Sequence, residues 1–334
     1  MKLSIFSALA VIATLLFSGA ASAQATYHAF IWSANTGMQD LGSLGGSSYA
    51  QGINASGQVV GYYVSLLGQL RPFLWTESGG IEDLGTLGGD AGVAAGINDS
   101  GQVVGWSTTT AGVAHAFLWS AGGGMKDLGT LGGNSSSATG ISRSGQVTGT
   151  STTKPGDKYN HAFLWKNKPR MTDLGALTGH NSYAFGINDS VVVVGESTLT
   201  ANVTPYHAFL RRPRHRMVDL GTLGGDNSVA IAINGSGSVV GNSYVSGGCC
   251  FGFVWTPAGG MQNLGPSATS FSAASGINSL GVIVGNYELT SPVFHAVIWT
   301  APNQIQDLGV LGGTYSTATA INDSGQVVGY STLQ

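Results

Sequence analysis

The sequence is poor in charge, proline and cysteine. Of its 334 residues, 9% are charged, 9 are proline and 2 are cysteine, and the formal net charge is −3. Because 13 lysines and arginines stand against 16 aspartates and glutamates, the chain lacks the positive field that nucleic-acid binding requires, and we expect no nucleic-acid partner. Since 43% of the residues are hydrophobic, the composition also excludes a disordered polar chain.

Glycine is abundant, with 53 copies. It does not fall at every third position, which excludes a collagen-like helix. So much glycine with so little proline indicates many tight turns between short strands.

The first 23 residues predict a cleaved secretory signal. Lys2 gives a positive start, residues 5–17 form an apolar run, and Ala21-Ser22-Ala23 is a small-x-small cleavage site. A membrane anchor is the alternative, but the run is shorter than the roughly 20 residues of a spanning helix and no second run follows, so we expect no membrane span. We therefore expect cleavage near Ala23 and a secreted protein, extracellular or periplasmic, in an oxidising compartment.

Seven repeats account for the rest of the chain. Each carries four phrases in a fixed order: H-A-F-L-W, D-L-G, G-I-N-x-S-G and V-V-G. The isoleucines of the third phrase lie 44 to 46 residues apart, at Ile53, Ile97, Ile141, Ile187, Ile233, Ile277 and Ile321. The tryptophan of the first phrase recurs at Trp32, Trp75, Trp119, Trp165, Trp255 and Trp299, and we place Leu210 in that slot in the remaining copy.

Each repeat predicts four short β-strands. The phrases are short apolar segments bounded by Gly, Asn, Asp and Ser, and none keeps a 3.6-residue period. Four strands in about 44 residues make one propeller blade, so we predict an all-β, seven-bladed β-propeller with four antiparallel strands per blade. Residues 24–334 then form a single domain. Leucine-rich solenoids have shorter repeats and fit less well.

The chain ends predict how the ring closes. By analogy with other propellers, the G-I-N segment is the innermost strand, followed outwards by the V-V-G, H-A-F-L-W and D-L-G segments. The mature chain begins on a third strand and ends after a second one, so one blade is composite and combines residues 317–329 with residues 27–42. Joining the ends keeps the 14-residue spacing of other copies between the V-V-G glycine and the tryptophan slot, and it removes exposed sheet edges.

The repeated phrases resemble those of the HAF-repeat family of bacterial extracellular proteins. The resemblance rests on H-A-F, D-L-G-x-L-G-G and G-I-N-x-S-G-Q-V-V-G, and it covers residues 28–330. It implies export and a repeat fold, and no particular activity. The departures are Arg71-Pro72 and Phe251-Gly252 in place of His-Ala, Leu210 for Trp, and Asn263 for Asp.

Histidine and aspartate recur in the repeats and invite a metal or acid–base interpretation. Five histidines lie in the first phrase and six aspartates in the second. A residue repeated in every blade is spread around a ring and does not converge on one centre. We therefore interpret these residues as a hydrogen-bonding framework within each blade, and we expect no metal and no cofactor.

Candidate ligand residues lie where the copies differ in length. Every length change above one residue falls between V-V-G and the next tryptophan, which predicts the loop between second and third strands. Aromatic rings with scattered polar groups suit carbohydrate recognition, and packing of the loops on one another is the alternative. The candidates in this segment are Tyr62, Tyr63, Arg71, Trp106, Tyr159, Glu196, Tyr206, Tyr244 and Tyr287, and His180 joins them from the turn after D-L-G on the same face. The leading hypothesis is a secreted, non-catalytic binding protein that recognises carbohydrate or a cell-surface component.

Two other functions stay open. An extracellular polysaccharide hydrolase or lyase would use carboxylates, and the non-repeated acids on this face are Glu196, Asp226, Asp90 and Glu288. No nucleophile, metal or cofactor motif accompanies them. A purely structural surface protein is the third possibility, and in each case we expect a monomer.

Basic residues concentrate in two turns of neighbouring repeats: Lys166, Lys168, Arg170, Arg211, Arg212, Arg214 and Arg216. The turns join third to outermost strands, so both are predicted at the rim of the opposite face. Such a patch could bind an anionic cell-surface polymer, lipid head groups or a protein, with solvated loop charge as the alternative.

The two cysteines, Cys249 and Cys250, are adjacent. Zinc needs about four ligands and no others are nearby, so a metal site is not expected. An oxidising compartment allows a vicinal disulfide, although neighbouring Cα atoms are closer than in usual bridges, and two thiols are the alternative.

Overall fold

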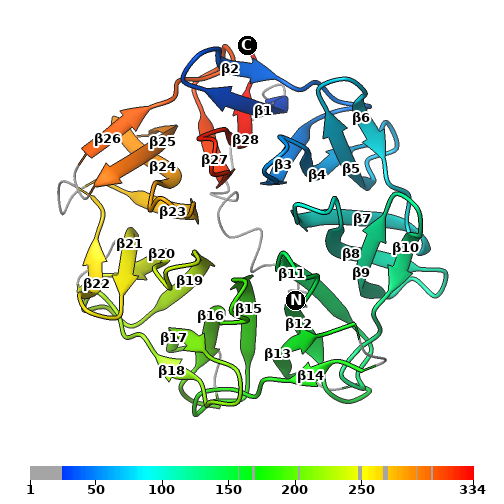
Figure 1. The fold of residues 1–334 in the computed structure, drawn as a ribbon, viewed down its shortest axis with the longest axis vertical. Coiled ribbons are helices and arrows are strands. Elements are labelled where there is room, and N and C mark those ends of the chain that lie inside the picture. The colour runs from blue at the N-terminus through cyan, green and yellow to red at the C-terminus, as the bar shows by residue number, and fades with distance from the viewer. Residues whose placement is uncertain are drawn as a thin grey trace, which may run out of the picture.

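The computed structural model describes residues 25–156, 158–167, 170–201, 204–246, 250–265, 270–290, 292–301 and 304–334. These residues form 28 strands and no helix, and therefore contain no helix of the length and hydropathy that a membrane crossing requires. The strands pair into seven four-stranded sheets, which stand around a central axis as the blades of a ring (Figure 1). All strand pairs within the blades are antiparallel, so the predicted seven-bladed β-propeller is confirmed.

In each blade the four strands follow one another from the channel to the rim. The innermost strands are β3 (Ser48–Ile53), β7 (Gly88–Ile97), β11 (Ser136–Ile141), β15 (Ser182–Ile187), β19 (Ser228–Ile233), β23 (Ser272–Ile277) and β27 (Ser316–Ile321). The second strands are β4 (Val59–Val64), β8 (Val103–Thr109), β12 (Val147–Thr152), β16 (Val193–Thr198), β20 (Val239–Tyr244), β24 (Ile283–Thr290) and β28 (Val327–Thr332).

The third and outermost strands complete the blades. The third strands are β1 (Tyr27–Ser33), β5 (Leu70–Thr76), β9 (Ala114–Ser120), β13 (Asn160–Trp165), β17 (Tyr206–Arg211), β21 (Cys250–Thr256) and β25 (Val293–Ala301). The outermost strands are β2 (Gly37–Asp40), β6 (Gly80–Asp83), β10 (Gly124–Asp127), β14 (Thr172–Asp173), β18 (Val218–Asp219), β22 (Gly260–Asn263) and β26 (Gln304–Asp307).

The strand order defines two faces of the ring. Hairpins between first and second strands, and turns between third and outermost strands, lie on one face, which we call the hairpin face. Loops between second and third strands, and the connections between blades, lie on the other, which we call the variable face. The basic turns therefore belong to the hairpin face and the predicted ligand loops to the variable face.

The ring closes through a composite blade, as the sequence predicts. Its strands run in the order β2, β1, β28 and β27, so the first two and the last two strands of the chain share one sheet (Figure 1). The closing pair is antiparallel and extends from Tyr27 opposite Thr332 to Trp32 opposite Val327. The blue first strand and the red last strand thus share main-chain hydrogen bonds, and neither is left as a free edge.

Each blade buries both of its faces against its neighbours. The phenylalanines of the third strands, such as Phe117 and Phe163, are fully buried. Phe163 and Trp165 share one apolar cluster with Val104 and Ala116 of the preceding blade. Burial of each large apolar side chain contributes roughly 1.5–3 kcal/mol, so the blade seams hold most of the core energy.

Polar side chains also join neighbouring blades. The hydroxyl of Ser48 accepts the amide of Ala29, at 2.9 Å, from the preceding blade and donates to the carbonyl of Gly42 at 2.6 Å. In the hairpin after β3, the Asn54 side chain accepts the amide of Gln58 and donates to the carbonyl of Asn98 in the next blade. The repeated Ser and Asn of the sequence are therefore connectors between blades.

The repeated histidines and aspartates form the predicted framework. Nδ1 of each phrase histidine lies 2.8–3.0 Å from a carboxylate oxygen on the outermost strand of the same blade, in the pairs His28–Asp40, His115–Asp127, His161–Asp173, His207–Asp219 and His295–Asp307. The same carboxylates accept the amide of the glycine two residues further along the chain, as Asp173 does from Gly175. Although burial alone raises the pKa of Asp173, these hydrogen bonds hold it below its usual value.

The strand register corrects one assignment made from the sequence. Val59 lies opposite Trp75, and the equivalent Val193 lies opposite Arg211. The residue in the tryptophan slot of this blade is therefore Arg211, and Leu210 occupies the leucine slot that precedes it. The assignment from the sequence was wrong by one residue, because this copy reads H-A-F-L-R-R and has no tryptophan to mark the slot.

Candidate ligand site at the mouth of the central channel

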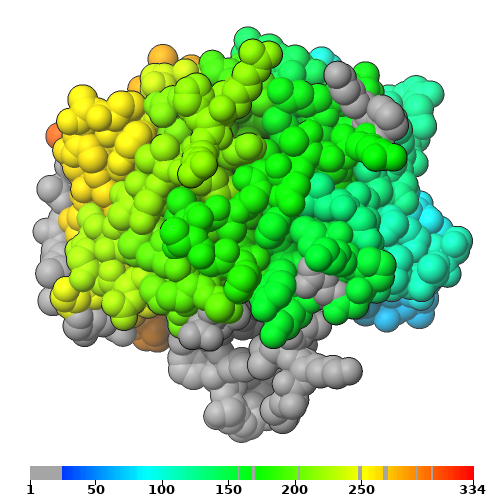
Figure 2. Space-filling model, turned by 90° about the horizontal axis from the view of Figure 1, so that it is seen from below, coloured from blue at the N-terminus to red at the C-terminus, as the bar shows by residue number. Residues whose placement is uncertain are grey.

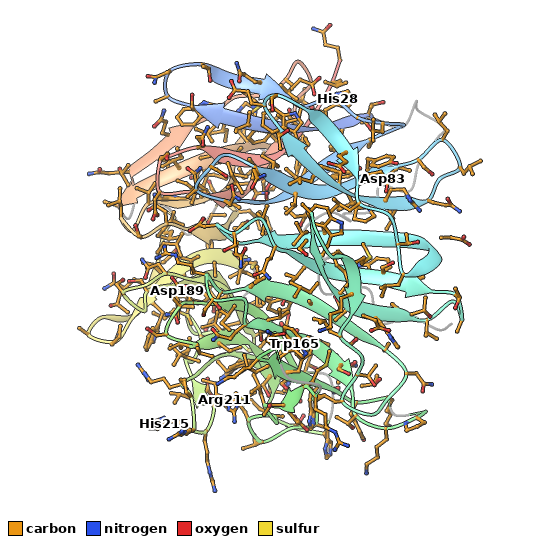
Figure 3. The ribbon with its side chains drawn as sticks, turned by 45° about the vertical axis from the view of Figure 1, so that its right-hand side comes forward. His28, Asp83, Trp165, Asp189, Arg211 and His215 are labelled. Atoms are coloured by element: carbon orange, nitrogen blue, oxygen red, sulfur yellow. The ribbon has the colours of Figure 1, made fainter. Side chains whose placement is uncertain are left out.

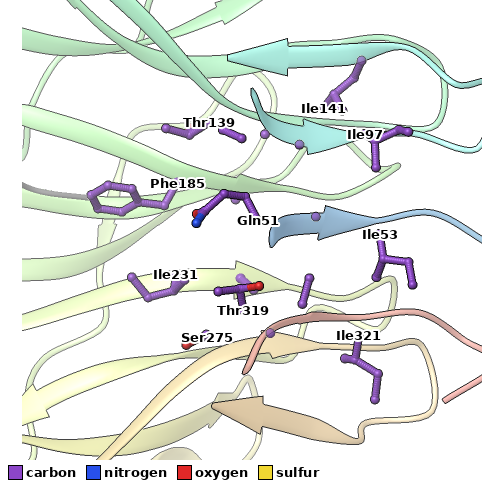
Figure 4. Close-up of a pocket in the computed structure, with 18 of the residues that line it drawn as sticks. Gln51, Ile53, Ile97, Thr139, Ile141, Phe185, Ile231, Ser275, Thr319 and Ile321 are labelled. Atoms are coloured by element: carbon purple, nitrogen blue, oxygen red, sulfur yellow. The ribbon is translucent and has the colours of Figure 1, made fainter. Parts of the chain in front are cut away.

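A cavity of about 410 Å³ occupies the central channel. All seven innermost strands line it, together with Tyr62 and Tyr330 from two second strands. Because each innermost strand runs along the channel, the position of a residue in that strand sets its depth (Figure 4). Ligand pockets commonly have volumes of a few hundred Å³, so the cavity is large enough for a small molecule or the end of a polymer.

Two layers of the lining differ in character. The seven isoleucines of the G-I-N phrases lie towards the hairpin face, since each directly precedes the first residue of its hairpin. The layer towards the variable face comes from the residue two positions earlier and differs in most blades: Gln51, Ala95, Thr139, Phe185, Ile231, Ser275 and Thr319. In Figure 4 this layer is separated along the channel from the isoleucines of the G-I-N phrases. A ring of unlike residues can select a ligand and its orientation, whereas a ring of identical ones cannot.

The polar side chains of this layer differ in their availability. The hydroxyl of Thr139 donates to the carbonyl of Ala184 at 2.8 Å, and that of Thr319 donates to Ala50 at 3.0 Å, so both are committed to blade seams. Within the described chain, the side chains of Gln51 and Ser275 have no hydrogen-bond partner. No charged residue, histidine or cysteine is among the described lining residues. This donor set suits a neutral polar ligand better than a metal ion.

Five tyrosines gather beside the cavity at the seam where the ring closes: Tyr27, Tyr49, Tyr62, Tyr315 and Tyr330. The rings of Tyr49 and Tyr62 stack with centroids 4.8 Å apart, and Tyr330 meets Tyr49 edge-on at 5.0 Å. Tyr27 contacts Tyr49, Tyr315 and Tyr330 at 5.7–6.1 Å. We call this group the tyrosine cluster.

Tyr62, Tyr315 and Tyr330 stay neutral at physiological pH. Burial raises the pKa of Tyr62, and the neighbouring Tyr49 raises it further. Burial likewise raises the pKa of Tyr315 and of Tyr330, which hydrogen-bond to one another. Of these three tyrosines, Tyr62 and Tyr330 reach the wall of the channel and present uncharged rings and hydroxyl groups there.

Glu196 occupies on β16 the position that Tyr62 occupies on β4, directly after V-V-G. It lies opposite Tyr183 on β15 and Ala208 on β17. Burial raises the pKa of Glu196 to about 7, and no described residue pairs with its carboxylate. Its charge in turn raises the pKa values of Tyr183 and Tyr206, which burial has already raised.

The remaining predicted ligand residues lie around the variable face and outside the cavity lining. Trp106 is half-buried opposite Val93 on β7, and Tyr287 packs in the core of its blade. The rings of Tyr159 and His180 lie 4.7 Å apart, and the Lys158 ammonium is 5.3 Å from the Tyr159 ring. The main-chain amide of Tyr206 donates to the side chain of Asn227 at 3.0 Å, and Tyr244 is 39% exposed at the end of β20.

Tyr63 and Arg71 form a structural ion-pair group with Asp83. Arg71 takes the place of the phrase histidine, and its Nε and Nη2 donate to the Asp83 carboxylate at 3.0 Å. The Tyr63 hydroxyl donates to the same carboxylate at 2.6 Å. Burial opposes ionisation of Asp83, but these donors outweigh it and lower the pKa of that carboxyl, while burial and Asp83 raise the pKa of Tyr63 to about 12.

The four predicted acids do not meet in one cleft that the structure defines. Asp90 is exposed near the start of β7, and Asp226 is exposed in the connection before β19. The carboxylate of Glu288 accepts the amide of Phe271 at 3.2 Å. Glu196 and Asp226 border the same blade seam, because the residue after V-V-G lies beside the innermost strand of the next blade.

The basic turns lie on neighbouring blades, at the rim that faces the viewer in Figure 2. Lys166, Arg170, Arg212, Arg214 and Arg216 are exposed. Arg211 lies near Asp173 of the preceding blade, which counters the lowering of the Arg211 pKa by burial. Lys168, Cys249 and the predicted signal of residues 1–23 lie outside the described residues, and Cys250 begins β21.

Sequence reasoning missed the variable layer of the channel and four members of the tyrosine cluster. One signal was available for the layer. The residue type at this position varies among the copies, whereas the residue before it is always alanine and the residue after it is glycine or alanine. Because the innermost strand lines the channel, such a position marks candidate ligand contacts.

The fold places the chain among the seven-bladed β-propellers. No family model matches the chain, and none of the curated proteins matches it. Solved structures do match. A TolB structure from Agrobacterium tumefaciens is 10% identical, with 93% of this chain and 99% of that chain covered and a TM-score of 0.51.

Two enzyme structures match as well. A puromycin hydrolase structure is 15% identical, with 84% of this chain and 49% of that chain covered and a TM-score of 0.52. A gluconolactonase from Xanthomonas campestris is 13% identical, with 91% and 95% covered and a TM-score of 0.44. At such identities the likeness extends to the fold alone.

Proposed function

We propose that the protein is an exported, non-catalytic binding propeller of the HAF-repeat type, and that it binds a neutral carbohydrate at the variable-face mouth of its channel. The observation that carries the proposal is the meeting of Tyr62, Tyr330 and Gln51 on the wall of one 410 Å³ cavity. Tyrosine rings stack on the apolar face of a sugar, and an uncommitted amide binds its hydroxyl groups.

The charge distribution supports a neutral ligand. The described residues that line the cavity are uncharged, and the pKa values of Tyr62 and Tyr330 are raised. A charged ligand would lose its hydration in the channel without gaining an ion pair.

Binding to immobilised oligosaccharides, followed by calorimetry with the best ligand, tests the proposal. We expect Tyr62→Ala and Gln51→Ala each to weaken binding about tenfold, and Tyr62→Phe to retain most of it because the ring remains. Tyr244→Ala is the matched control, because Tyr244 lies on the same face but outside the cavity lining. An array without a neutral glycan ligand, or unchanged affinity in both alanine variants, would refute the site.

A second candidate function rests on Glu196. A carboxyl group whose pKa lies near 7 is suited to general-acid catalysis of polysaccharide cleavage. If the protein is a hydrolase or lyase, Glu196→Gln should abolish the release of new chain ends from a polysaccharide panel, and Asp90→Asn should not. The absence of cleavage by the wild-type protein across the panel would exclude this candidate and leave the binding function standing.

A further inference from the structure

A second cavity opens between the blades β15–β18 and β19–β22, and its volume is about 400 Å³. It lies on the hairpin face, opposite to the proposed carbohydrate mouth. Its walls are the hairpin of residues 188–192, the hairpin of residues 235–237, the basic turn after β17, and Pro257. The proposed function leaves this cavity unused.

Hydrogen bonds within the turn hold the side chains of Arg211 and His215 in place. The Nε of Arg211 donates to the carbonyl of His215 at 3.2 Å, and the His215 amide donates to Arg212 at 3.1 Å. The His215 imidazole donates through Nδ1 to the carbonyl of Pro213 at 2.8 Å, which leaves Nε2 for another partner. Figure 3 shows Arg211 and His215 close together at one end of the molecule. The turn is therefore preorganised, which lowers the entropic cost of binding.

Arg212 gives the cavity a positive charge. His215 also lines the cavity, and no aspartate or glutamate is among the described lining residues. The nearby Asp189 is directed elsewhere, because its carboxylate accepts the amide of Arg143 at 2.8 Å and lies 3.7 Å from the Arg143 guanidinium. The cavity thus offers positive charge without an internal counter-ion.

Three of the seven hairpins have an aspartate at a position where the other four have Ala55, Arg143, Gly235 and Ser279. At three other seams a hairpin aspartate accepts the amide of the preceding hairpin, as Asp99 does from Ala55 and Asp323 does from Ser279. Gly235 stands at the aspartate position of this seam, and nothing lies within 4 Å of where its Cβ would be. No described residue accepts the amide of Asp189, so a place for a carboxylate is open beside the cavity.

The backbone is strained in the hairpin of residues 188–192, which forms another wall of the cavity. Val191 has φ 61°, at a position where the other six copies have glycine. A β-branched residue rarely adopts this conformation, and such strain gathers at functional sites. Arg214 in the facing turn also has a positive φ of 63°.

We propose that this cavity binds an anionic saccharide, whose carboxylate or sulfate group pairs with Arg212 while Nε2 of His215 accepts one of its hydroxyl groups. The hydroxyls of Ser190 and Ser236 and the apolar surface of Pro257 are the remaining contacts for a sugar ring. Guanidinium groups match the geometry of carboxylate and sulfate oxygens, which is why arginine is placed to select the charge.

Calorimetric titration of the full protein with a sulfated disaccharide, a uronate disaccharide, a neutral disaccharide and inorganic sulfate tests the proposal. We expect the sulfated or the uronate disaccharide to bind at least tenfold more tightly than the neutral disaccharide and inorganic sulfate. Arg212→Ser should weaken this binding tenfold or more. Gly235→Asp should weaken it equally, because the new carboxylate fills the open place and repels the ligand.

Matched controls separate this site from its surroundings. Arg170→Ser removes an exposed arginine of the neighbouring basic turn, and Ala55→Asp adds the same carboxylate at another seam, so both should change the affinity less than twofold. Tyr62→Ala should also leave it unchanged, which keeps the test independent of the channel site.

Three outcomes would overturn the proposal. They are equal binding of the neutral disaccharide, equal binding of inorganic sulfate, and an affinity of folded Arg212→Ser and Gly235→Asp within twofold of the wild type. Thermal melting establishes that the variants are folded. We expect both to fold, because Arg212 is exposed and nothing lies within 4 Å of where the Cβ of residue 235 would be.

Discussion

Val191 adopts a left-handed backbone conformation that six glycines adopt at the same hairpin position in other blades, with φ values of 73–85°. Its amide donates to Asn188 at 2.9 Å, as the amide of Gly101 donates to Asn98 at 3.0 Å, so the hairpin itself is unchanged. The surrounding structure therefore imposes on valine a conformation that costs about 1–2 kcal/mol.

Replacing Val191 by glycine should stabilise the protein. Relief of the strain outweighs the loss of the partial packing of Val191, and we expect a gain of about 1 kcal/mol in the free energy of unfolding. Denaturant unfolding measures the change. Gly101→Val is the matched control and should destabilise by about 1–2 kcal/mol. A Val191→Gly variant less stable than the wild type would contradict this account.

Glu196 should make stability depend on pH near neutrality. Folding raises the pKa of Glu196 from its ordinary value of 4.5 to about 7, so between these pH values the folded protein holds a proton that the unfolded chain has released. The free energy of unfolding therefore falls as pH rises through this window, by about 1–3 kcal/mol. Unfolding curves at pH 4.5 to 8 should show that Glu196→Gln is more stable than the wild type at pH 8 and similar at pH 4.5. Asp90 is exposed, so the stability of the Asp90→Asn variant should depend on pH as that of the wild type does. If the stability of the Glu196→Gln variant also shows the pH dependence of the wild type, the effect is disproved.

At the residue scale the sequence is informative about repeated positions and less so about unique ones. The histidine–aspartate pairs were predicted because repetition identifies a framework. The slip between Leu210 and Arg211 arose because a single degenerate copy does not fix its own register, which the pairing of Val193 with Arg211 does. The tyrosine cluster needs both the closure and the side-chain directions, and its members lie far apart in the sequence.

At the scale of elements, side-chain amides connect the blades into a belt. An asparagine of the innermost hairpin donates to a carbonyl of the next hairpin at six seams, including Asn322 to Asn54 across the closure at 3.0 Å. Ser142 replaces asparagine at the seventh seam. Its hydroxyl accepts the amide of Gln146 at 3.0 Å and donates within its own hairpin, so it gives no bond to the next blade.

Ser142→Asn should complete the belt. The new amide would donate to the carbonyl of Asn188, and we expect a gain of about 0.5–1.5 kcal/mol in the free energy of unfolding. Asn98→Ser should remove the equivalent bond at an intact seam and lose a similar amount. Denaturant unfolding of both variants, and of the double variant, gives the comparison. A destabilised Ser142→Asn protein would show that the Arg143–Asp189 contacts already satisfy this seam.

Strand existence and order could be predicted from the repeats, whereas the cavity between blades could not. The replacement of aspartate by Gly235 is visible in the sequence, but the basic turn reaches the same seam only through a loop whose shape depends on Arg211, Pro213 and His215. Such loop geometry is set by a few local hydrogen bonds and leaves no periodic signal.

At the scale of the whole molecule, the chain ends lie where another blade has an ordinary loop. The composite blade is interrupted between β28 and β1, which correspond to β4 and β5 of the next blade. The closing seam has the same Asn322 to Asn54 bond as the others, and Thr319 adds a bond to Ala50 at 3.0 Å. Since the contacts at this seam match those of continuous blades, closure does not depend on where the chain begins.

A circular permutant tests this equivalence. Joining Gln334 directly to Gln24 reproduces the 14-residue spacing of the other copies, and new ends between Leu66 and Leu67 fall in a loop whose leucines are 89% and 84% exposed. We expect this permutant to fold with an unfolding free energy within about 1 kcal/mol of the parent, because no blade contact is lost. New ends between Ser56 and Gly57 would instead cut an innermost hairpin and its Asn54 bonds, and should cost several times more. Equal stability of the two permutants would show that the hairpin belt does not hold the ring, and failure of the first alone would show that the native ends are required for closure.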